Sequence, residues 1–262
     1  MTKVRPFTSE RKCREKIEEI VFGIERRCPN CNEPLHQARR YWWCSVCRRK
    51  ITARSVTWLK GSNISYGQLF LLLGAWQKKI APGAVKQLVG IAYPTVARWY
   101  AKFRANLPSE NAPLSGVVEV DESFFGRKKY RNQRIVMGAI ERKTRRIKLG
   151  EIPDREQDTL EGFLLKNVTV DSLLHTDCHP GYYDIGWNGY GHQLHNHSLG
   201  HFKDTNQIEN VWSVAKRHIR KMFGQLRTGK LPEFIKEWEA RANQPVLFKS
   251  QISYLEVCLV QD

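Results

Sequence analysis

Three acidic residues in separate parts of the chain, Asp121, Asp177 and Glu209, are the first candidates for chemistry. Asp121 lies in the segment VVEVDESFF, where aliphatic residues alternate with Glu119 and Asp121 as in a strand whose second face carries acids. Asp177 ends the apolar segment LLHTD, and Glu209 lies in a helical pattern. Acids at strand ends and on a helix that packs against the same sheet would converge on one spot.

An acid cluster of this kind needs cations, because like charges a few ångströms apart repel and raise each other's pKa. Mg²⁺ and Mn²⁺ are hard ions that take oxygen ligands. Two such ions about 4 Å apart activate a water or a 3′-hydroxyl and stabilise the leaving oxygen of a phosphodiester. We therefore expect Asp121, Asp177 and Glu209 to bind Mg²⁺ or Mn²⁺ together, although each acid taken singly is better explained as a solvated surface residue.

Four cysteines form a second candidate site in the segment CPNCNEPLHQARRYWWCSVC: Cys28, Cys31, Cys44 and Cys47. Two Cys-x-x-Cys pairs separated by twelve residues have the spacing of a zinc ribbon, in which four thiolates surround Zn²⁺. A redox pair or four free thiols is the alternative. The basic and aromatic residues around the pairs are typical of a nucleic-acid-binding module, although at least one tryptophan is expected in the ribbon's own core.

The elements that must position the acids follow a polar linker, residues 107–116. We predict strands at 117–124, 134–142 and 146–152, a helix at 156–167, strands at 173–178 and HQLHNHS, a helix at 205–222 and a last helix, LPEFIKEWEARAN. This order is that of an RNase H-like α/β domain. In the helix at 205–222, Glu209, Ser213 and Lys216 share a face that avoids the apolar stripe.

Upstream of the linker, the sequence predicts a helix-turn-helix. Its helices fall within residues 64–105, with a turn at 90–93. Arg98, Trp99 and Lys102 would then face the major groove, although a generic helical hairpin has the same period. The expected domain order is an N-terminal helix at 1–25, a zinc ribbon at 26–60, the helix-turn-helix at 61–108, the catalytic domain at 116–245 and a C-terminal tail at 246–262.

The charge of the chain indicates a polyanionic partner. Forty-three Lys and Arg against 26 Asp and Glu give a formal net charge of +17, spread along the whole chain, and nucleic acid is the simplest partner. A merely basic protein is the alternative. No apolar run approaches the ~20 residues that span a bilayer, and the N-terminus lacks a secretory signal. We expect no membrane partner and a cytoplasmic, nucleoid-associated protein, or a nuclear one in a eukaryote.

The segments VEVDESFFGRKK, HTDCHPGYYDIG, NHS and TNQIENVWSVAKR resemble the catalytic domain of DDE transposases of the ISXO-like insertion-sequence group, which are related to the Merlin elements. The upstream ribbon and helix-turn-helix are similar to the N-terminal half of that group. The resemblance implies that Asp121, Asp177 and Glu209 are the catalytic acids and that Lys216 contacts DNA. Some members carry Asn or His as the third residue, so Asn206 or Asn210 could share the role of Glu209.

Other polar residues near the acids have less certain roles. Arg127 and Lys128 lie in the basic turn GRKKYRNQR, where contact with the DNA backbone is the prediction and a solvated hairpin tip the alternative. Glu119 shares the face of Asp121 and could support it, whereas Glu122 points the other way and is expected to be a surface or salt-bridging residue. Four histidines suggest either a second zinc site or polar strand and DNA contacts, the latter being favoured: His192, His195, His197 and His201.

These observations predict a transposase that cleaves phosphodiester bonds at the ends of its element and transfers the freed 3′-hydroxyl to target DNA. Its partners would be double-stranded DNA, both terminal inverted repeats and target, and further copies of itself, as a dimer or a larger assembly. A metal-dependent nuclease without strand transfer and a non-catalytic DNA-binding regulator are the alternatives.

Overall fold

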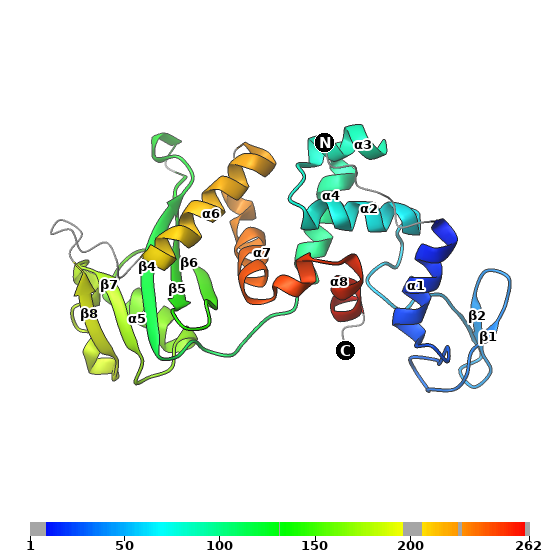
Figure 1. The fold of residues 1–262 in the computed structure, drawn as a ribbon, viewed down its shortest axis with the longest axis horizontal. Helices are drawn as coiled ribbons and strands as arrows, with labels where there is room; N and C mark the ends of the chain where they lie inside the picture. Colours follow the sequence, from blue (N-terminus) through cyan, green and yellow to red (C-terminus); the bar gives the residue numbers. More distant parts are fainter. Residues whose placement is uncertain (1–8, 131, 196–205, 225–226, 260–262) are drawn as a thin grey trace. The chain divides into compact units, whose positions relative to one another are not determined.

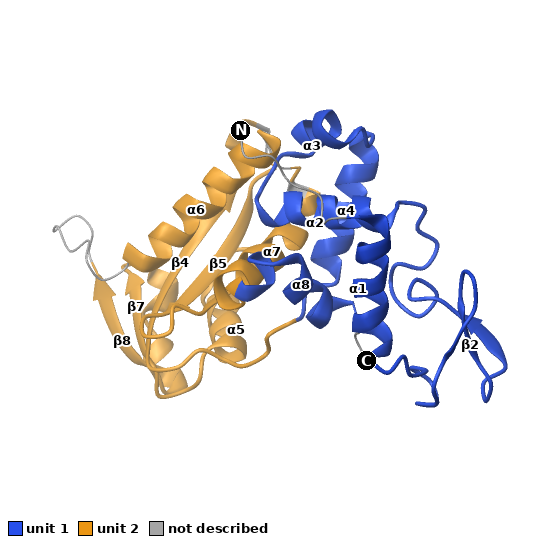
Figure 2. Cartoon of the chain, turned by 45° about the vertical axis from the view of Figure 1, so that its right-hand side comes forward, with its two compact units in different colours: residues 1–108, 246–262 blue, residues 109–245 orange. Residues whose placement is uncertain are grey.

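The computed structural model describes residues 9–130, 132–195, 206–224 and 227–259 (Figure 1). The chain divides into two compact units, and Figure 2 colours them separately. Unit 1 comprises residues 1–108 and 246–262, and unit 2 comprises residues 109–245. No helix in the described part of the chain is both long enough and apolar enough to cross a membrane.

Unit 1 combines helices with a small antiparallel sheet. Its helices are α1 (Glu10–Phe22), α2 (Tyr66–Gln77), α3 (Pro82–Val89), α4 (Tyr93–Ala105) and α8 (Gln251–Cys258). Its strands are β1 (His36–Gln37), β2 (Trp42–Cys44) and β3 (Arg49–Ile51), in the order β1-β2-β3. The N-terminus of α2 is capped twice, because Ser65 forms a capping box with Gln68 and the Glu10 carboxylate accepts bonds from Tyr66 N and Gly67 N. Glu10 therefore ties α1 to α2.

The last residues of the chain complete the core of unit 1. The sequence suggested only a tail for residues 246–262, but they contain α8. Tyr254 Oη donates to the carbonyl of Phe103 at 2.8 Å, and Trp58 Nε1 donates to the carbonyl of Cys258 at 2.7 Å. The Tyr254 ring also packs edge-on against Trp76. Segments from both ends of the sequence therefore build one core.

Unit 2 is built on a sheet whose described strands lie in the order β6-β5-β4-β7-β8. The strands are β4 (Val117–Phe125), β5 (Arg134–Glu141), β6 (Ile147–Ile152), β7 (Leu173–Asp177) and β8 (Gly191–His195). The β4–β5 and β5–β6 pairs are antiparallel, whereas the β4–β7 and β7–β8 pairs are parallel. This topology confirms the predicted RNase H-like α/β fold.

Helices cover both faces of this sheet. On one face, α5 (Gln157–Asn167) shares a hydrophobic core with Val118 and Val120 of β4. On the other face, α6 (Asn206–Phe223) and α7 (Leu231–Asn243) share a core with Phe125 of β4. Neighbouring residues of β4 therefore point into different environments, and Glu119 and Asp121 fall on the α6 side.

Candidate active site and metal centres

Asp121 and Asp177 lie beside each other on adjacent parallel strands. The register of β4 and β7 pairs Glu119 with His175, and two further residues along each strand bring Asp121 level with Asp177. Burial, together with the charges of Glu122 and Asp177, raises the pKa of Asp121 to about 6. The charge of Asp177 thus reaches Asp121 and disfavours its ionisation, which a bound cation would relieve.

Helix α6 is tied to β4 at its N-terminus by a buried carboxylate. Glu119 Oε2 accepts hydrogen bonds from the backbone N–H groups of Gln207 at 2.9 Å and Ile208 at 3.1 Å. Its other oxygen pairs with Arg142 Nε at 2.8 Å, and the Glu119 side chain is only 1% exposed. First-turn N–H groups have no partner within a helix, and the positive end of the helix favours an anion there. Both oxygens of Glu119 are engaged, so this residue holds α6 in place.

A second contact fixes α6 beside Asp121. Trp212 Nε1 donates to Asp121 Oδ2 at 3.0 Å. The Trp212 ring lies over Gly138, which pairs with Asp121 across β4 and β5. A Cβ atom at Gly138 would lie 2.6 Å from the Trp212 ring, so only glycine leaves room for this approach. The sequence prediction gave no role to Gly138, although a glycine inside a strand is a known signal of such an approach.

Glu209 lies on α6 between these two attachments. It is exposed, as are Asn206 and Asn210. Lys216, seven residues further along α6, places Nζ 5.7 Å from the centre of the Phe125 ring of β4. Among the described residues, the three acids do not bring their ligand oxygens within 4.8 Å of one another, a condition that only the cysteine cluster meets. The carboxylates therefore form an open set, with a pair on the sheet and a third on the attached helix.

Of the two expectations for Glu122, a surface or a salt-bridging residue, the structure confirms the second. The strand turns it away from Asp121, as predicted, but its side chain is only 1% exposed. It is salt-bridged to Arg155, whose Nη2 lies 2.7 Å from Glu122 Oε2 and 3.7 Å from Asp177 Oδ2. The Tyr182 hydroxyl donates to its other oxygen. Its partners come from distant segments, so the sequence pattern could not reveal that this acid is buried, and Arg155 supplies positive charge next to Asp177.

Of the four candidate histidines, His192 and His195 are described, and both contact residues of the neighbouring strand β7. His195 Nε2 lies 2.7 Å from His175 Nδ1, with the two buried rings stacked. His192 Nε2 lies 2.8 Å from Thr176 Oγ1, and burial lowers the pKa of His192. These contacts agree with polar strand positions. His197 and His201 lie outside the described residues.

The four ribbon cysteines converge in unit 1. All four Sγ atoms lie within 4.8 Å of one another. The Cys28–Cys47 and Cys31–Cys44 sulfur atoms are 3.9 Å and 3.4 Å apart, close to the ~3.8 Å edge of a tetrahedron with Zn–S bonds of about 2.3 Å. The Asn30 side chain and the backbone N–H of Cys47 donate to sulfur atoms in the cluster. Trp42 is buried and Trp43 is partly exposed, so one tryptophan belongs to the ribbon core as predicted.

The predicted helix pair is present as α3 and α4, with Gly90 in the left-handed conformation at the turn (φ 70°). Arg98 is exposed, and Lys102 is half-buried with Nζ 5.1 Å from the centre of the Trp99 ring. The expectation that Trp99 faces outward is wrong, because it is 3% exposed and packs against Trp58 and Phe103. This correction leaves Arg98 and Lys102 as the basic candidates on α4.

The basic turn after β4 is exposed at Arg127 and Lys128. A short 3₁₀ helix, Lys128–Tyr130, lies within it. The backbone N–H of Arg127 donates to Asn132 Oδ1 at 2.9 Å. The turn therefore presents basic side chains at the end of the strand that carries Asp121.

Comparison with known proteins identifies relatives of the chain. Residues 113–243 match the family of ISXO2-like transposase domains. An uncharacterized transposase-like protein of Haemophilus influenzae is 33% identical over 109 residues, which cover 40% of this chain and 86% of the relative. The catalytic core domain of BIV integrase matches with a TM-score of 0.37 at 13% identity, and the match covers 50% of this chain and 84% of the integrase chain. The HTLV-2 integrase catalytic core domain in complex with magnesium has a TM-score of 0.34 at 14% identity, with coverages of 52% and 89%.

Proposed function

The chain belongs to the ISXO2-like transposase family, and from this premise we propose that it cleaves DNA at the ends of its element and joins the freed 3′-hydroxyl to target DNA. The observation that carries the proposal is the attachment of α6 to β4. Glu119 and Trp212 hold α6 so that Glu209 lies between them, on the side of the sheet that carries Asp121. Asp121, Asp177 and Glu209 are the proposed catalytic acids.

The carboxylates are the proposed ligands of Mg²⁺ or Mn²⁺. Their oxygens suit hard cations, and burial together with neighbouring negative charge raises the pKa of Asp121, so a bound cation would favour its ionised form. When bound, such ions would activate the attacking water or hydroxyl and stabilise the leaving oxygen. Trp212 orients one oxygen of Asp121, and Arg155 steadies Asp177 from the opposite side. Glu209, on α6, is the proposed third ligand.

The remaining basic residues are proposed to hold DNA. Lys216 on α6, with Arg127 and Lys128 in the turn after β4, would contact phosphates near the acids. Arg98 and Lys102 on α4 would contact the terminal inverted repeats. The cysteine cluster, with Zn²⁺ bound by Cys28, Cys31, Cys44 and Cys47, would hold the ribbon together beside them. Joining two DNA ends requires a dimer or a larger assembly.

Strand cleavage and strand transfer on labelled DNA that carries the element's own terminal sequence test this proposal. With Mg²⁺ or Mn²⁺, we expect joined products from the wild type and none from Asp121→Ala. Asp171→Asn removes an exposed carboxylate at the opposite end of β7 and serves as the matched control, with products retained. Cleavage without joining would favour a nuclease, and binding without metal-dependent chemistry would favour a regulator.

The third acid needs a separate comparison. Glu209→Gln keeps the size of the side chain but removes its charge, and we expect loss of cleavage. Asn206→Ala changes the first residue of α6 and is expected to retain most of the activity. Full cleavage by Glu209→Gln together with its loss in Asn206→Ala would transfer the role to Asn206.

A further inference from the structure

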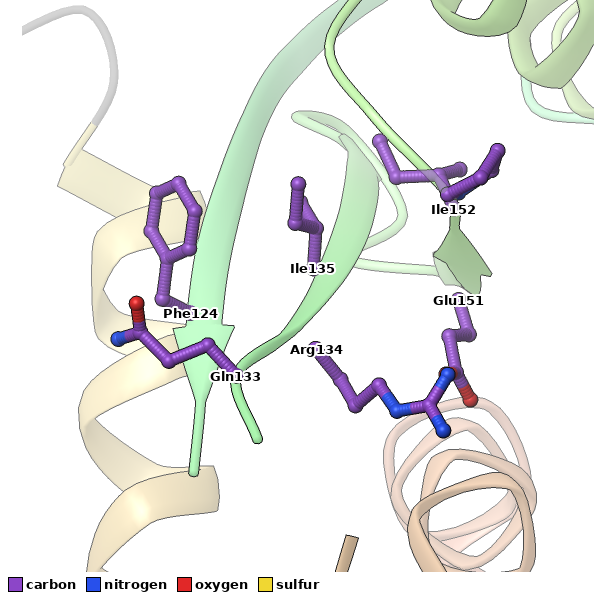
Figure 3. Close-up of a pocket in the computed structure, with 7 residues that line it drawn as sticks. Phe124, Gln133, Arg134, Ile135, Glu151 and Ile152 are labelled. Atoms are coloured by element: carbon purple, nitrogen blue, oxygen red, sulfur yellow. The ribbon is translucent and has the colours of Figure 1, made fainter. Parts of the chain in front are cut away.

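A pocket lies where β4, β5 and β6 run side by side. Phe124, Ile135 and Ile152 form its apolar wall, and they occupy paired positions on the three strands (Figure 3). Its volume is about 400 Å³, within the range of roughly 300–1,000 Å³ that is usual for ligand sites. Phe124 is 44% exposed, which is unusual for a large aromatic ring on a central strand. The pocket therefore offers an open aromatic surface beside aliphatic side chains.

The rim of the pocket is polar and can form directional hydrogen bonds. Arg134, the first residue of β5, borders the pocket, as do Gln133 just before β5 and Glu151 on β6 (Figure 3). Arg134 Nη1 lies 3.2 Å from Glu151 Oε1, and the Arg134 side chain is 55% exposed. An amide, a guanidinium and a carboxylate together provide both donors and acceptors. Apolar walls with a few such groups suit a flat heteroaromatic ring.

The position of the pocket brings it close to the basic turn after β4, which is a proposed DNA contact. Phe124 is three residues beyond Asp121 on the same strand, roughly 10 Å at 3.3 Å per residue, and its side chain points to the opposite face of the sheet, the face that α5 covers. The basic turn with Arg127 and Lys128 joins β4 to β5 directly beside it. Positive charge around an apolar pocket favours a polyanion that carries aromatic rings over an uncharged side chain of a protein partner.

We propose that the Phe124 pocket binds an unpaired nucleobase of the DNA on which the enzyme acts, and this inference rests on the proposed function. The base stacks on the Phe124 ring, while Gln133 and Arg134 contact its edge. The adjoining phosphates lie on the basic turn. Extracting one base in this way would anchor a DNA strand at the end of β4, with the base on the α5 face of the sheet and the scissile phosphate at Asp121 on the α6 face.

The test is metal-free binding of the full chain to fluorescent DNA, so that it stays independent of catalysis. One series uses element-end duplexes with a single-stranded overhang, and another uses target duplexes with one unpaired base. In each series the unpaired nucleotide is either intact or abasic. Base–aromatic stacking predicts roughly 5- to 150-fold tighter binding of one intact form by the wild type. The responsive series identifies the strand that supplies the base.

Three variants complete the test. Phe124→Ala should bind intact and abasic DNA equally, whereas Phe124→Tyr keeps a ring and should keep the preference. Trp187→Ala removes an 89% exposed ring elsewhere in unit 2 and is the matched control, with the preference retained. Equal binding of both forms by the wild type, or a preference that survives in Phe124→Ala, would overturn the proposal. Loss of self-association in Phe124→Ala with the base preference unchanged would instead assign the pocket to a second copy.

This design separates the two proposals. Base preference in the wild type without metal-dependent cleavage would support the pocket and count against the transposase. Cleavage and joining without any base preference would support the transposase and reject the pocket.

Discussion

In the cysteine cluster of unit 1, the ligand atoms are already together, with all four sulfur atoms within 4.8 Å of one another. In the acid set of unit 2, two carboxylates lie on adjacent strands and the third lies on a helix held by other residues. The first site comes from two tight turns in one short segment. The second depends on Glu119, Trp212 and Arg155, none of which is a proposed ligand.

Charge explains the difference. The pKa of Cys31 is raised to about 12: a hydrogen bond from the backbone of Glu33 lowers it, but burial and the three neighbouring thiols outweigh that effect. Neutral thiols pack together without repulsion. Carboxylates stay ionised at neutral pH unless their pKa is shifted strongly, so they cannot pack as closely without a cation. The cysteine ligands are therefore brought together by their own short segment and the zinc ion that they are proposed to bind, whereas the acid set needs a scaffold that keeps its carboxylates near but apart.

The largest loss of stability is expected when the cysteine cluster is broken. Cys44→Ser should lose zinc and unfold the ribbon, because structural zinc binding contributes roughly 10–16 kcal/mol that is also folding free energy. Limited proteolysis should then cut within residues 26–60 while unit 2 stays resistant, and metal analysis should show the loss of zinc. Cys178→Ser changes an exposed cysteine outside the cluster and should alter neither result. Zinc retained by Cys44→Ser would contradict the assignment.

The next largest loss is expected when Glu119, which holds α6 beside the acid set, is removed. Glu119→Ala leaves Arg142 and two first-turn N–H groups of α6 without their acceptor, so we expect a loss of about 2–4 kcal/mol in the free energy of unfolding. Cleavage should also fall in conditions where the variant is folded. Urea unfolding and the cleavage assay measure the two effects.

Glu10→Ala is the matched control for Glu119, because Glu10 also caps a helix N-terminus from another element. It is exposed, so a loss of about 0.5–2 kcal/mol is expected, without a direct effect on cleavage. Equal loss of cleavage in Glu10→Ala and Glu119→Ala would show that cleavage does not depend on the position of α6 that Glu119 maintains.

A smaller loss of stability is expected when the space between Gly138 and the Trp212 ring is filled. Gly138→Ala places a methyl group against the indole and Leu149, with an expected loss of about 1–3 kcal/mol and weaker cleavage as Trp212 moves from Asp121. Gly162→Ala on α5 has open space around its Cβ and should instead gain up to about 1 kcal/mol through helix propensity. Thermal unfolding of the two variants gives opposite signs if the packing is correct, and a neutral Gly138→Ala would contradict it.

The smallest effect concerns the charge of Asp121. Burial raises its folded-state pKa to about 6, above the value of about 3.9 in an unfolded chain. Between these values the folded state binds more protons, so this residue's contribution to stability falls as pH rises from about 4 to about 6. Without added Mg²⁺, Asp121→Asn should be more stable than the wild type by about 1–2 kcal/mol at pH 7, and the difference should vanish near pH 4.

Urea titrations at both pH values measure this difference. Addition of Mg²⁺ at pH 7 should stabilise the wild type and leave Asp121→Asn unchanged. A constant gap between pH 4 and pH 7 would show that ionisation of Asp121 is not its source.

The sequence predicted the elements well where one period dominates. The other described strands and helices of unit 2 lie within two residues of their expected positions, because alternation and helical stripes are strong there, whereas the expected strand HQLHNHS extends past the end of β8 at His195 into residues that are not described. Trp99 was placed on the wrong side of α4, although its spacing of three from Val96 and four from Phe103 matches the buried stripe. The helical spacing of Trp99 alone predicts that it is buried, but the hypothesis of a DNA-binding helix favoured an exposed tryptophan.

The scaffold of the acid set could not be predicted in the same way. Glu119 and Glu122 are both buried acids, and a pattern of alternating acids and aliphatic residues predicts only which face each one occupies. Their partners, Arg142, Arg155 and the first turn of α6, come from other segments. Whether a buried acid binds a metal or holds a helix depends on those partners, which only the folded chain brings together.

The return of the chain to unit 1 affects the order of events on the ribosome. Residues 109–245 emerge before α8, so unit 2 can fold while unit 1 still lacks the helix that accompanies Trp58 and Phe103. A translation product that stops after residue 245 would contain the whole acid set but an incomplete partner unit. During synthesis, completion of unit 1 therefore waits for translation of the last helix.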